Sequence, residues 1–301
     1  MGDVVELGFQ SSVRPGLGFE VMRFSQLRRR TLTHALDGLT RPRFHLVGAC
    51  LTGRSRHRVD FERCLVRAHD LFFVAPGRVQ AFDPTPGLEL ALLLFTPEFL
   101  QLSADPRLVD PLRGARVLSP FWKTPVLHVP KTVWPDVHGL MGQLEREYAR
   151  PADGVQNAVL SSLLRALLLQ LERLVTNAEG ASTAPPALEK FRETLEQGLE
   201  TSRSVEHYAR LAKVTPRALN RLTLRHLGAG AKETIDARVV LELKRLLAYS
   251  DLSVKELSAR FAFDEPTNLV KFFKLHAGTT PQRFREAQRA GNDLEKGTTR
   301  A

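Results

Sequence analysis

The sequence predicts an α+β protein in which an antiparallel β-barrel and a helical pair precede an all-α domain. Three observations support this fold class. Between residues 44 and 99, short runs rich in Val, Leu and Phe alternate with turns that contain Gly or Pro, as antiparallel strands do. After Pro135 the apolar residues recur about every 3.6 positions, which indicates helices. Near the C-terminus, a stretch of helical sequence is repeated after fifty residues.

The strands of the barrel are expected in short runs. Residues 1–30 show no regular apolar pattern and are expected to form an irregular arm. The runs that follow are separated by turn residues such as Gly53, Pro84 and Pro86. They are expected at residues 44–47, 57–61, 71–77, 79–82 and 88–95.

The helical pair carries a leucine seam on its second helix, which is expected over residues 155–175. Leucines recur there in alternating steps of four and three, the spacing of a heptad seam. The seam predicts a homodimer contact, with packing of the helix on its own barrel as the alternative. The expected interface residues are Leu160, Leu164, Leu167, Leu171 and Leu174.

A change in composition marks the domain boundary. Residues 176–187 lack periodicity and contain the consecutive prolines Pro185 and Pro186, as a linker does. We therefore expect a first domain over residues 1–175, a linker over 176–187 and an all-α domain over 188–290. Residues 291–301 are expected to form a disordered tail.

The all-α domain contains a loose repeat. Residues 215–219, which read TPRAL, correspond to residues 265–269, which read EPTNL, and Gly228 corresponds to Gly278. Each copy predicts a short helix, a turn, a second helix and a glycine stop, which is a helix-turn-helix. Between the copies, a helix is expected over residues 231–249, and its 19 residues would span about 28 Å. That length can hold two reading helices about one DNA turn apart.

Charge is distributed unevenly in the two copies. The chain has a formal net charge of +10, which favours a polyanionic partner without identifying one. From His207 to Lys232 there are six bases and no acid, and from Pro266 to Arg285 there are four bases and no acid. These windows cover the second helix of each copy, where contacts to phosphates and bases would lie.

Residues on the second helices that are not needed for the core are expected to contact double-stranded DNA. Arg and Lys can donate to guanine, and Asn can pair with adenine in the major groove. The expected base-reading residues are Arg217, Asn220, Arg221, Thr267, Asn268 and Lys271. The expected phosphate contacts are Lys213, Thr215, Arg225, Lys274 and Arg285.

The second copy carries the most specific motif. It reads DLSVKELS over residues 251–258, followed by Phe263-Asp264, Phe272-Phe273-Lys274, Gly278, Thr280-Pro281 and Phe284-Arg285. With these residues, the stretch 205–285 resembles the DNA-binding unit of AraC-type transcriptional regulators. The resemblance implies base contacts at the positions expected above. Two positions depart from the family pattern: Thr223 replaces a phenylalanine, and Ala262 replaces a glycine, which would strain the turn if its φ is positive.

The N-terminal part resembles, more weakly, the cupin-like sensing domains that precede this DNA-binding unit. The similar stretches are residues 72–79 and 93–100. Enzymatic cupins bind a metal through a His-x-His pair, which this chain lacks, so no metal, cofactor or catalytic residue is expected. His45 and His57 are the candidate contacts to a small-molecule effector.

The resemblance implies a transcription regulator that binds a specific DNA sequence, senses a small molecule and forms a homodimer, with RNA polymerase as a further partner. A cupin-type metalloenzyme with a helical accessory domain is the alternative, and metal analysis would separate the two. A helical protein-interaction module is disfavoured, because residues 217, 220, 221, 267 and 271 are all polar. The two cysteines lack a metal or redox spacing, and no apolar run suffices for a membrane span, so a cytoplasmic location is expected.

Overall fold

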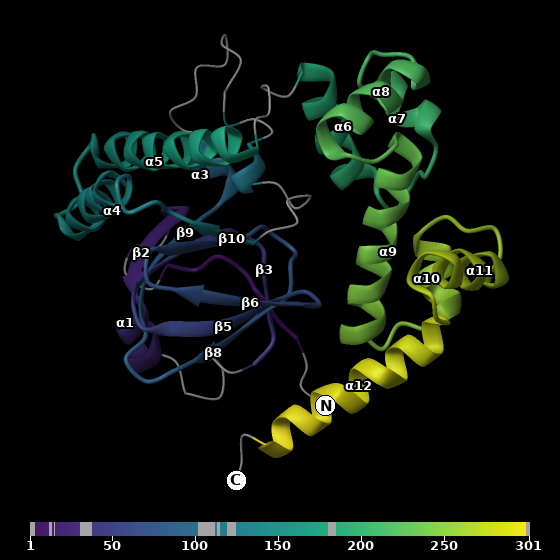
Figure 1. Ribbon diagram of the computed structural model, residues 1–301, viewed down its shortest axis with the longest axis horizontal. Helices are drawn as coiled ribbons and strands as arrows, with labels where there is room; N and C mark the ends of the chain where they lie inside the picture. Colours follow the sequence, from purple (N-terminus) through teal and green to yellow (C-terminus); the bar gives the residue numbers. More distant parts are fainter. Residues whose placement is uncertain are drawn as a thin grey trace. The chain divides into compact units, whose positions relative to one another are not determined.

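The computed structural model describes residues 4–11, 14, 16–30, 38–101, 112, 115–118, 125–179 and 185–298. These residues form two compact units, one within residues 4–180 and the other within 181–301 (Figure 1). The first unit contains β-sheets covered by helices, and the second contains helices only. The expected α+β class is therefore confirmed.

The first unit contains two five-stranded sheets. The order of the first sheet is β1 (Val5–Leu7), β3 (Thr40–Pro42), β8 (Gln80–Pro84), β5 (Arg54–Val59) and β6 (Glu62–Arg67). The order of the second is β10 (Val126–His128), β7 (Asp70–Val74), β4 (His45–Thr52), β9 (Glu89–Phe95) and β2 (Phe19–Arg23). The described strands pair antiparallel except β1 and β3, which run parallel. The sheets do not close on each other, so the expected barrel is corrected to two separate cupin-like sheets.

An apolar core that includes Val59, Phe82, Phe72 and Leu92 joins strands of both sheets. Gly48 of β4 makes room for the ring of Phe72: a Cβ atom at position 48 would lie 2.0 Å from the Phe72 Cζ atom. Real atoms do not approach so closely, which explains why a residue without a side chain stands in the middle of a buried strand.

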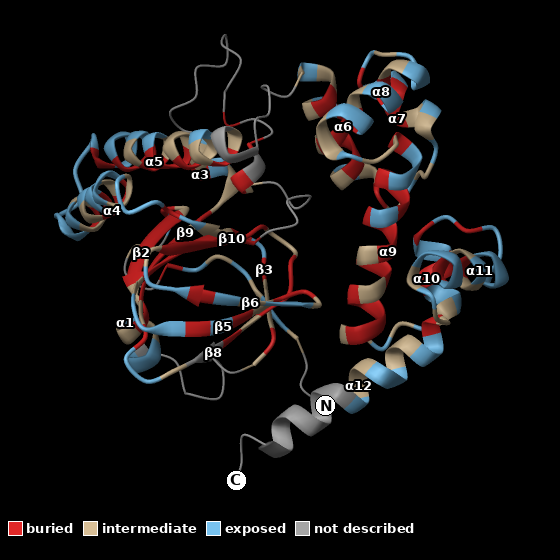
Figure 2. Ribbon diagram, viewed as in Figure 1, coloured by how far each residue is buried: buried red, intermediate tan, exposed pale blue. Residues whose placement is uncertain are grey.

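A second core lies on the other face of the β2, β4, β7 and β9 sheet. There α4 (Trp134–Ala149) and α5 (Gln156–Glu179) pack on alternate residues of the strands, such as Val47, Phe73 and Leu93. Figure 2 shows α5 buried along its side toward the sheet and exposed along the opposite side. The short α3 (Pro97–Gln101) and the 3₁₀ turn Arg116–Leu118 adjoin this core.

Part of the N-terminal arm is regular, contrary to the expectation. β2 pairs with the edge of β9, and α1 (Phe24–Arg30) follows it directly. Phe19 and Phe24 are fully buried in the two cores. The five residues of β2 are too short a run to reveal an alternating pattern, and their pairing partner lies some seventy positions away in the chain. Residues 1–3, 12, 13 and 15 of the expected arm lie outside the described residues.

The second unit consists of seven described helices. They are α6 (Pro186–Gly198), α7 (Val205–Leu211), α8 (Pro216–Leu227), α9 (Ala231–Tyr249), α10 (Val254–Arg260), α11 (Pro266–Ala277) and α12 (Pro281–Thr298). The helix expected over residues 231–249 is confirmed as α9. The last helix continues to Thr298, past the boundary expected at residue 290, and residues 299–301 of the expected tail lie outside the described residues.

Side-chain caps fix where these helices begin. The hydroxyl oxygens of Ser204, Thr215 and Ser253 each accept a hydrogen bond, 3.2 Å long, from the backbone N–H three residues later. Such caps satisfy backbone donors that have no partner within the helix. At the other end, α8 and α11 stop at Gly228 and Gly278, whose φ angles of 72° and 71° favour glycine. The sequence repeat is thus a structural repeat.

Candidate nucleic-acid interface

α7 with α8, and α10 with α11, form the two expected helix-turn-helix units, and α9 joins them (Figure 1). Leu219 and Leu269 occupy matching positions in α8 and α11, and both are fully buried. Four residues later, Thr223 and Phe273 are also fully buried. The Thr223 hydroxyl donates to the Asn220 carbonyl at 3.0 Å, so this smaller polar residue has a hydrogen-bond partner inside the first helix-turn-helix.

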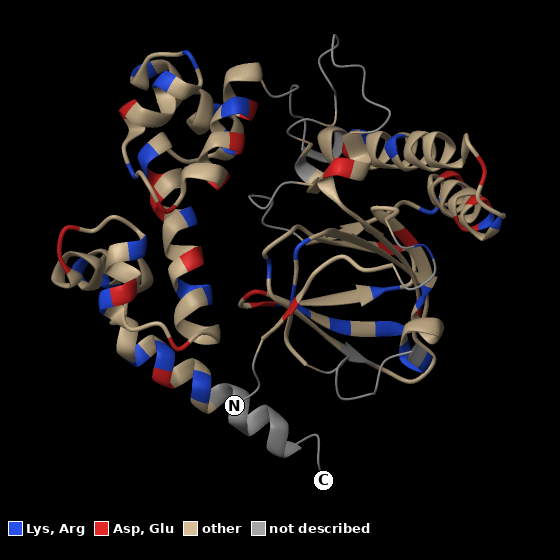
Figure 3. Cartoon of the chain, turned by 180° about the vertical axis from the view of Figure 1, so that it is seen from behind, with Lys and Arg blue, Asp and Glu red and all other residues tan. Residues whose placement is uncertain are grey.

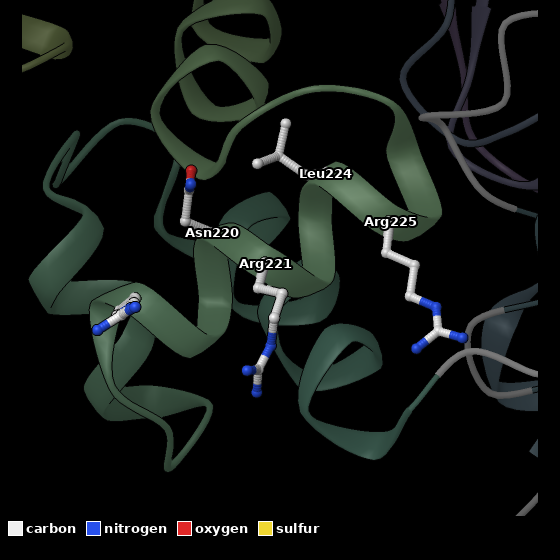
Figure 4. Close-up of a pocket in the computed structure, with 5 residues that line it drawn as sticks. Asn220, Arg221, Leu224 and Arg225 are labelled. Atoms are coloured by element: carbon white, nitrogen blue, oxygen red, sulfur yellow. The ribbon is translucent and has the colours of Figure 1, made fainter.

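The outer face of α8 is basic. Arg217, Arg221 and Arg225 are exposed, and with Asn220 and Leu224 they line one surface hollow (Figure 4). Within the ranges that the structure describes, these three guanidinium groups form no ion pair. Their charges are therefore available to an anionic partner, and the spacing of residues 217, 221 and 225 places them along one side of the helix.

Asn220 has a second role that the sequence did not reveal. Its Oδ1 atom accepts a hydrogen bond of 3.0 Å from the backbone N–H of Ala231, the first residue of α9. Figure 4 shows this side chain pointing away from that of Arg221. Bidentate reading of adenine would require Oδ1 to accept a further hydrogen bond. The side chain thus links α8 to the start of α9, while its amide nitrogen still has donors to offer.

The outer face of α11 is also polar. Thr267, Asn268, Lys271 and Lys274 are exposed. In the described part of the chain, neither lysine forms an ion pair. Lys and Arg positions recur on α8, α11 and α12 (Figure 3). The structure therefore repeats a basic face at both ends of α9.

The residues expected to contact phosphates separate into two groups. Lys213 and Thr215 are exposed in and after the turn that precedes α8, and Thr215 caps that helix. Arg285 of α12 is different: it is half-buried, and its guanidinium group donates to the carbonyl oxygens of Leu247, at 3.1 Å, and of Leu252. Burial lowers the pKa of Arg285. The expected phosphate contact is corrected, because this arginine instead ties α12 to the end of α9.

The turn between α10 and α11 contains a residue in the left-handed region. Ala262 has a φ of 50°, which satisfies the condition for strain that the sequence raised. Replacing Ala262 by Gly is expected to raise the free energy of unfolding of this unit by about 1 kcal/mol, a shift in Tm of about 4 °C. Calorimetry on the full chain would measure this change.

The matched control is Ala237→Gly, at an exposed position inside α9. The same chemical change should there lower the free energy of unfolding by about 1 kcal/mol, because Gly is a poor helix former. Equal effects at both positions would show that the φ of Ala262 carries no strain.

The two candidate effector residues lie on different sheets: His57 belongs to β5 of the first sheet and His45 to β4 of the second. The ring of His57 lies in the core between the sheets, 4.5 Å from the rings of Phe72 and Phe82, and its Nε2 atom is 2.9 Å from Gln80 Oε1. His45 stacks on Phe95 at 5.1 Å, on the face that α4 and α5 cover. Burial lowers the pKa of each histidine to about 4. One ligand therefore cannot contact both rings at once, because they lie in different cores.

The leucine seam of α5 faces the protein's own sheet. Leu160, Leu164, Leu167 and Leu171 are fully buried in the core formed with β4, β7 and β9, and Leu174 packs against that core. The expected homodimer interface is thus corrected to the alternative. A heptad spacing specifies which side of a helix is apolar, but it does not specify what covers that side. Among the described residues, the exposed large apolar side chains here are Val159 of α5 and Val155, which directly precedes that helix.

Among the residues described above, no group of three or more His, Cys, Asp or Glu side chains could hold a metal ion. No helix in the described ranges combines the length and the apolar character that a membrane span requires.

Comparison with known proteins gives matches in both units. The family model described as AraC-like ligand binding domain matches residues 27–188, and that described as Helix-turn-helix domain matches residues 208–287. The chain is 22% identical over 238 residues to the HTH-type transcriptional activator RhaR of Cronobacter sakazakii, which covers 78% of this chain and 81% of that relative.

Two further matches each cover about a third of the chain. The HTH-type transcriptional regulator GlxA of Rhizobium meliloti is 34% identical over 108 residues, which are 36% of this chain and 33% of that relative. The solved DNA-binding domain of AdpA in complex with a target DNA is 31% identical and covers 35% of this chain and 94% of its own, with a TM-score of 0.32. Since the ligand-binding model alone spans more than half of the chain, the protein belongs to the AraC-type family of transcriptional regulators, with a ligand-binding domain followed by a DNA-binding domain.

Proposed function

We propose that this regulator places α8 and α11 in successive major grooves on one side of a DNA duplex. Arg217 and Arg221 of α8, and Thr267, Asn268 and Lys271 of α11, would contact bases. The observation that carries the proposal is the repeated basic face at the two ends of α9, whose 19 residues span about 28 Å. With the flanking turns, this length suits helices separated by one DNA turn of about 34 Å.

The proposed phosphate contacts flank the proposed base contacts. Lys213 and Thr215 precede α8, Arg225 follows Arg221 by one helical turn, and Lys274 follows Lys271 in α11. Thr215 accepts from the N–H of Ala218 and keeps its own hydroxyl proton for donation. Backbone N–H groups at the start of a helix also favour a phosphate. Asn220 is proposed as a donor only, through its amide nitrogen.

Arg221→Ala tests the assignment of a base contact. The change is expected to weaken binding to a selected site by about 1–3 kcal/mol and to relax the preference at one base pair. The measurement is selection of binding sites from random DNA, followed by anisotropy titrations against each single-base variant of the preferred site.

Arg225→Ala is the matched control on the same helix. Because a phosphate contact carries no sequence information, this change should weaken binding to all sequences equally and reduce the salt slope by about 0.9. Uniform weakening by Arg221→Ala as well would move Arg221 to the phosphate group and remove it from the base-reading set.

We further propose that the ligand-binding domain senses a small-molecule effector in the region between the two sheets. His57 and Gln80 support this location, because they are buried polar residues in an otherwise apolar core. The Nδ1 atom of His57 has no hydrogen-bond partner in the structure. Mapping of bound DNA across the genome would suggest effector classes from the neighbouring genes, and thermal-shift titrations would test them.

A homodimer and a contact with RNA polymerase complete the proposal. The exposed Val159 of α5 and Val155, just before that helix, support a self-association surface there, in place of the buried leucines. Sedimentation of the full chain at several concentrations would test this part. A protein that acts on chromosomal DNA would work in the cytoplasm of a bacterium.

A further inference from the structure

The two helix-turn-helix units touch each other directly, besides their connection through α9. The Arg203 guanidinium, in the loop between α6 and α7, lies with its carbon 3.5 Å from the ring centroid of Phe263, in the turn between α10 and α11. Its Nη2 atom donates to the carbonyl oxygen of Ala262 at 3.2 Å. Beside them, Arg260 of α10 pairs with Glu200 at 2.7 Å. The loop that precedes the first helix-turn-helix unit therefore contacts the central turn of the second.

Two further series of contacts start from this pair, one at Phe263 and one at Arg203, and both end at Asp236. From Phe263, ring contacts lead to Phe272 at 5.3 Å and from there to His276 of α11 at 4.6 Å. From Arg203, the carbonyl oxygen accepts a hydrogen bond from Lys232 Nζ at 3.4 Å.

Two atoms of one carboxylate close the loop. Lys232 Nζ is 2.6 Å from Asp236 Oδ1, and Asp236 Oδ2 is 3.7 Å from His276 Nε2. We name this closed ring of contacts the inter-unit clamp, and its members are Arg203, Lys232, Asp236, Phe263, Phe272 and His276.

The inter-unit clamp joins elements of the two helix-turn-helix units, which would contact DNA separately. Arg203 directly precedes the first unit, Lys232 and Asp236 lie in the first turns of α9, and Phe272 and His276 belong to α11. A single helix between two units would still bend and twist. A second attachment removes that freedom, because rotation of one unit about α9 must break the contacts of the clamp.

Resting on the proposed use of α8 and α11 for DNA binding, we propose that Arg203 is a positioning residue that sets the spacing and rotational phase at which the two helices meet DNA. It touches no base. It acts by holding Phe263 and Ala262, and through them the start of α11, in one arrangement. A protein already held in the bound arrangement loses less conformational freedom on binding, which favours one spacing of the two DNA subsites over all others.

The chemistry of the contact requires arginine. A guanidinium is planar, so it can lie flat on the Phe263 ring and donate to a carbonyl in its own plane, whereas a lysine ammonium offers only a point charge. The φ of 50° at Ala262 belongs to the turn that presents this carbonyl. Arg203, Lys232 and Ala262 line one surface hollow, so this side of the clamp is near solvent and removal of the Arg203 side chain opens no core.

The test compares duplexes that differ only in the spacing between subsites. Three duplexes are compared. The first carries a selected two-part site at its preferred spacing, the second carries the same site with one base pair inserted between the subsites, and the third carries the α8 subsite alone. The Arg221→Ala variant identifies which subsite α8 contacts. The insertion adds about 3.4 Å and about 34° of rotation. The wild-type protein should bind the expanded site at least about tenfold more weakly, because one unit loses its base contacts.

Arg203→Ala, Arg203→Lys and Phe263→Leu should each reduce that ratio to about twofold, while binding to the α8 subsite alone stays within about twofold of wild type. Phe263→Leu keeps every charge and therefore separates the clamp from a direct phosphate contact. Arg225→Ala is the opposite control: it should weaken all three duplexes and leave the spacing ratio unchanged.

Three results would overturn the inference. A spacing ratio that stays at the wild-type value in folded Arg203→Ala and Phe263→Leu proteins removes the positioning role. The Arg203 variants could instead weaken binding to all three duplexes equally, with a salt slope smaller by about 0.9 in Arg203→Ala alone. That result would make Arg203 a phosphate contact. Absence of any preferred sequence for the wild-type protein refutes the proposed function and the clamp's role with it, and this outcome is recognisable before any variant is made.

Discussion

Raising the salt concentration from 50 to 200 mM is expected to weaken DNA binding by about 40-fold. The expectation comes from the exposed cations that are proposed to contact phosphates: Lys213, Arg225 and Lys274. Each neutralised phosphate releases condensed counterions, so the slope of log K against log salt should approach about −2.7 for one chain. Anisotropy titrations of the selected site at four or five salt concentrations would measure this slope.

Lys274→Ala provides the matched comparison, because it removes one cation from α11 and should make the slope shallower by about 0.9. Nearly constant affinity over the same salt range would contradict the interface. So would an unchanged slope in the variant, which would place Lys274 away from the DNA.

Glu242→Leu is expected to destabilise the DNA-binding unit by about 3–5 kcal/mol. Glu242 is buried in α9, where its Oε2 atom is 2.9 Å from Arg245 Nη1 and 3.3 Å from Arg238 Nη1. Arg245 is almost completely buried, with 1% of its surface exposed. Arg238 has a second carboxylate, because it makes two hydrogen bonds of 2.6 and 2.8 Å with Glu196 of α6. Removing the shared carboxylate takes a compensating charge from two guanidinium groups in a low-dielectric environment.

Denaturant unfolding of the full chain can isolate this effect. The two tryptophans, Trp122 and Trp134, both lie in the ligand-binding unit, so their fluorescence reports on that unit, whereas circular dichroism also follows the helices of the other. Glu242→Leu should shift the helical transition and leave the fluorescence transition in place. The double variant Glu242→Leu with Arg245→Met should lose less stability than Glu242→Leu alone, because apolar side chains can replace a buried ion pair. A larger loss in the double variant would show that Arg245 does not depend on Glu242.

The DNA-binding unit could be predicted closely because its helices are bounded by local chemistry. Ser204, Thr215 and Ser253 cap the starts of helices, and glycines stop two of them. These signals need only neighbouring residues. The outward set on α8 and α11 followed from the same periodicity. Asn220 and Arg285 differ because their partners, Ala231 and the end of α9, are set by tertiary packing that periodicity does not contain.

The ligand-binding unit was harder to predict because its decisive contacts are distant in sequence. β2 forms only through pairing with β9, and the seam of α5 is covered by strands that lie about seventy or more positions earlier. His57 and His45 looked equivalent as isolated histidines. Their strands belong to different sheets, and the partners Gln80 and Phe95 place the two rings in different cores, which no local pattern shows.

The glycine at position 48 has a consequence for the volume of the space in which an effector is proposed to bind. The Phe72 ring occupies the position that a side chain on this residue would take. Any heavier substituent would therefore compete with a benzene ring for one site, and the ring would have to turn toward His57, its edge-on neighbour at 4.5 Å. The absence of a side chain on β4 thus leaves the Phe72 ring of the neighbouring strand its place in the core between the sheets.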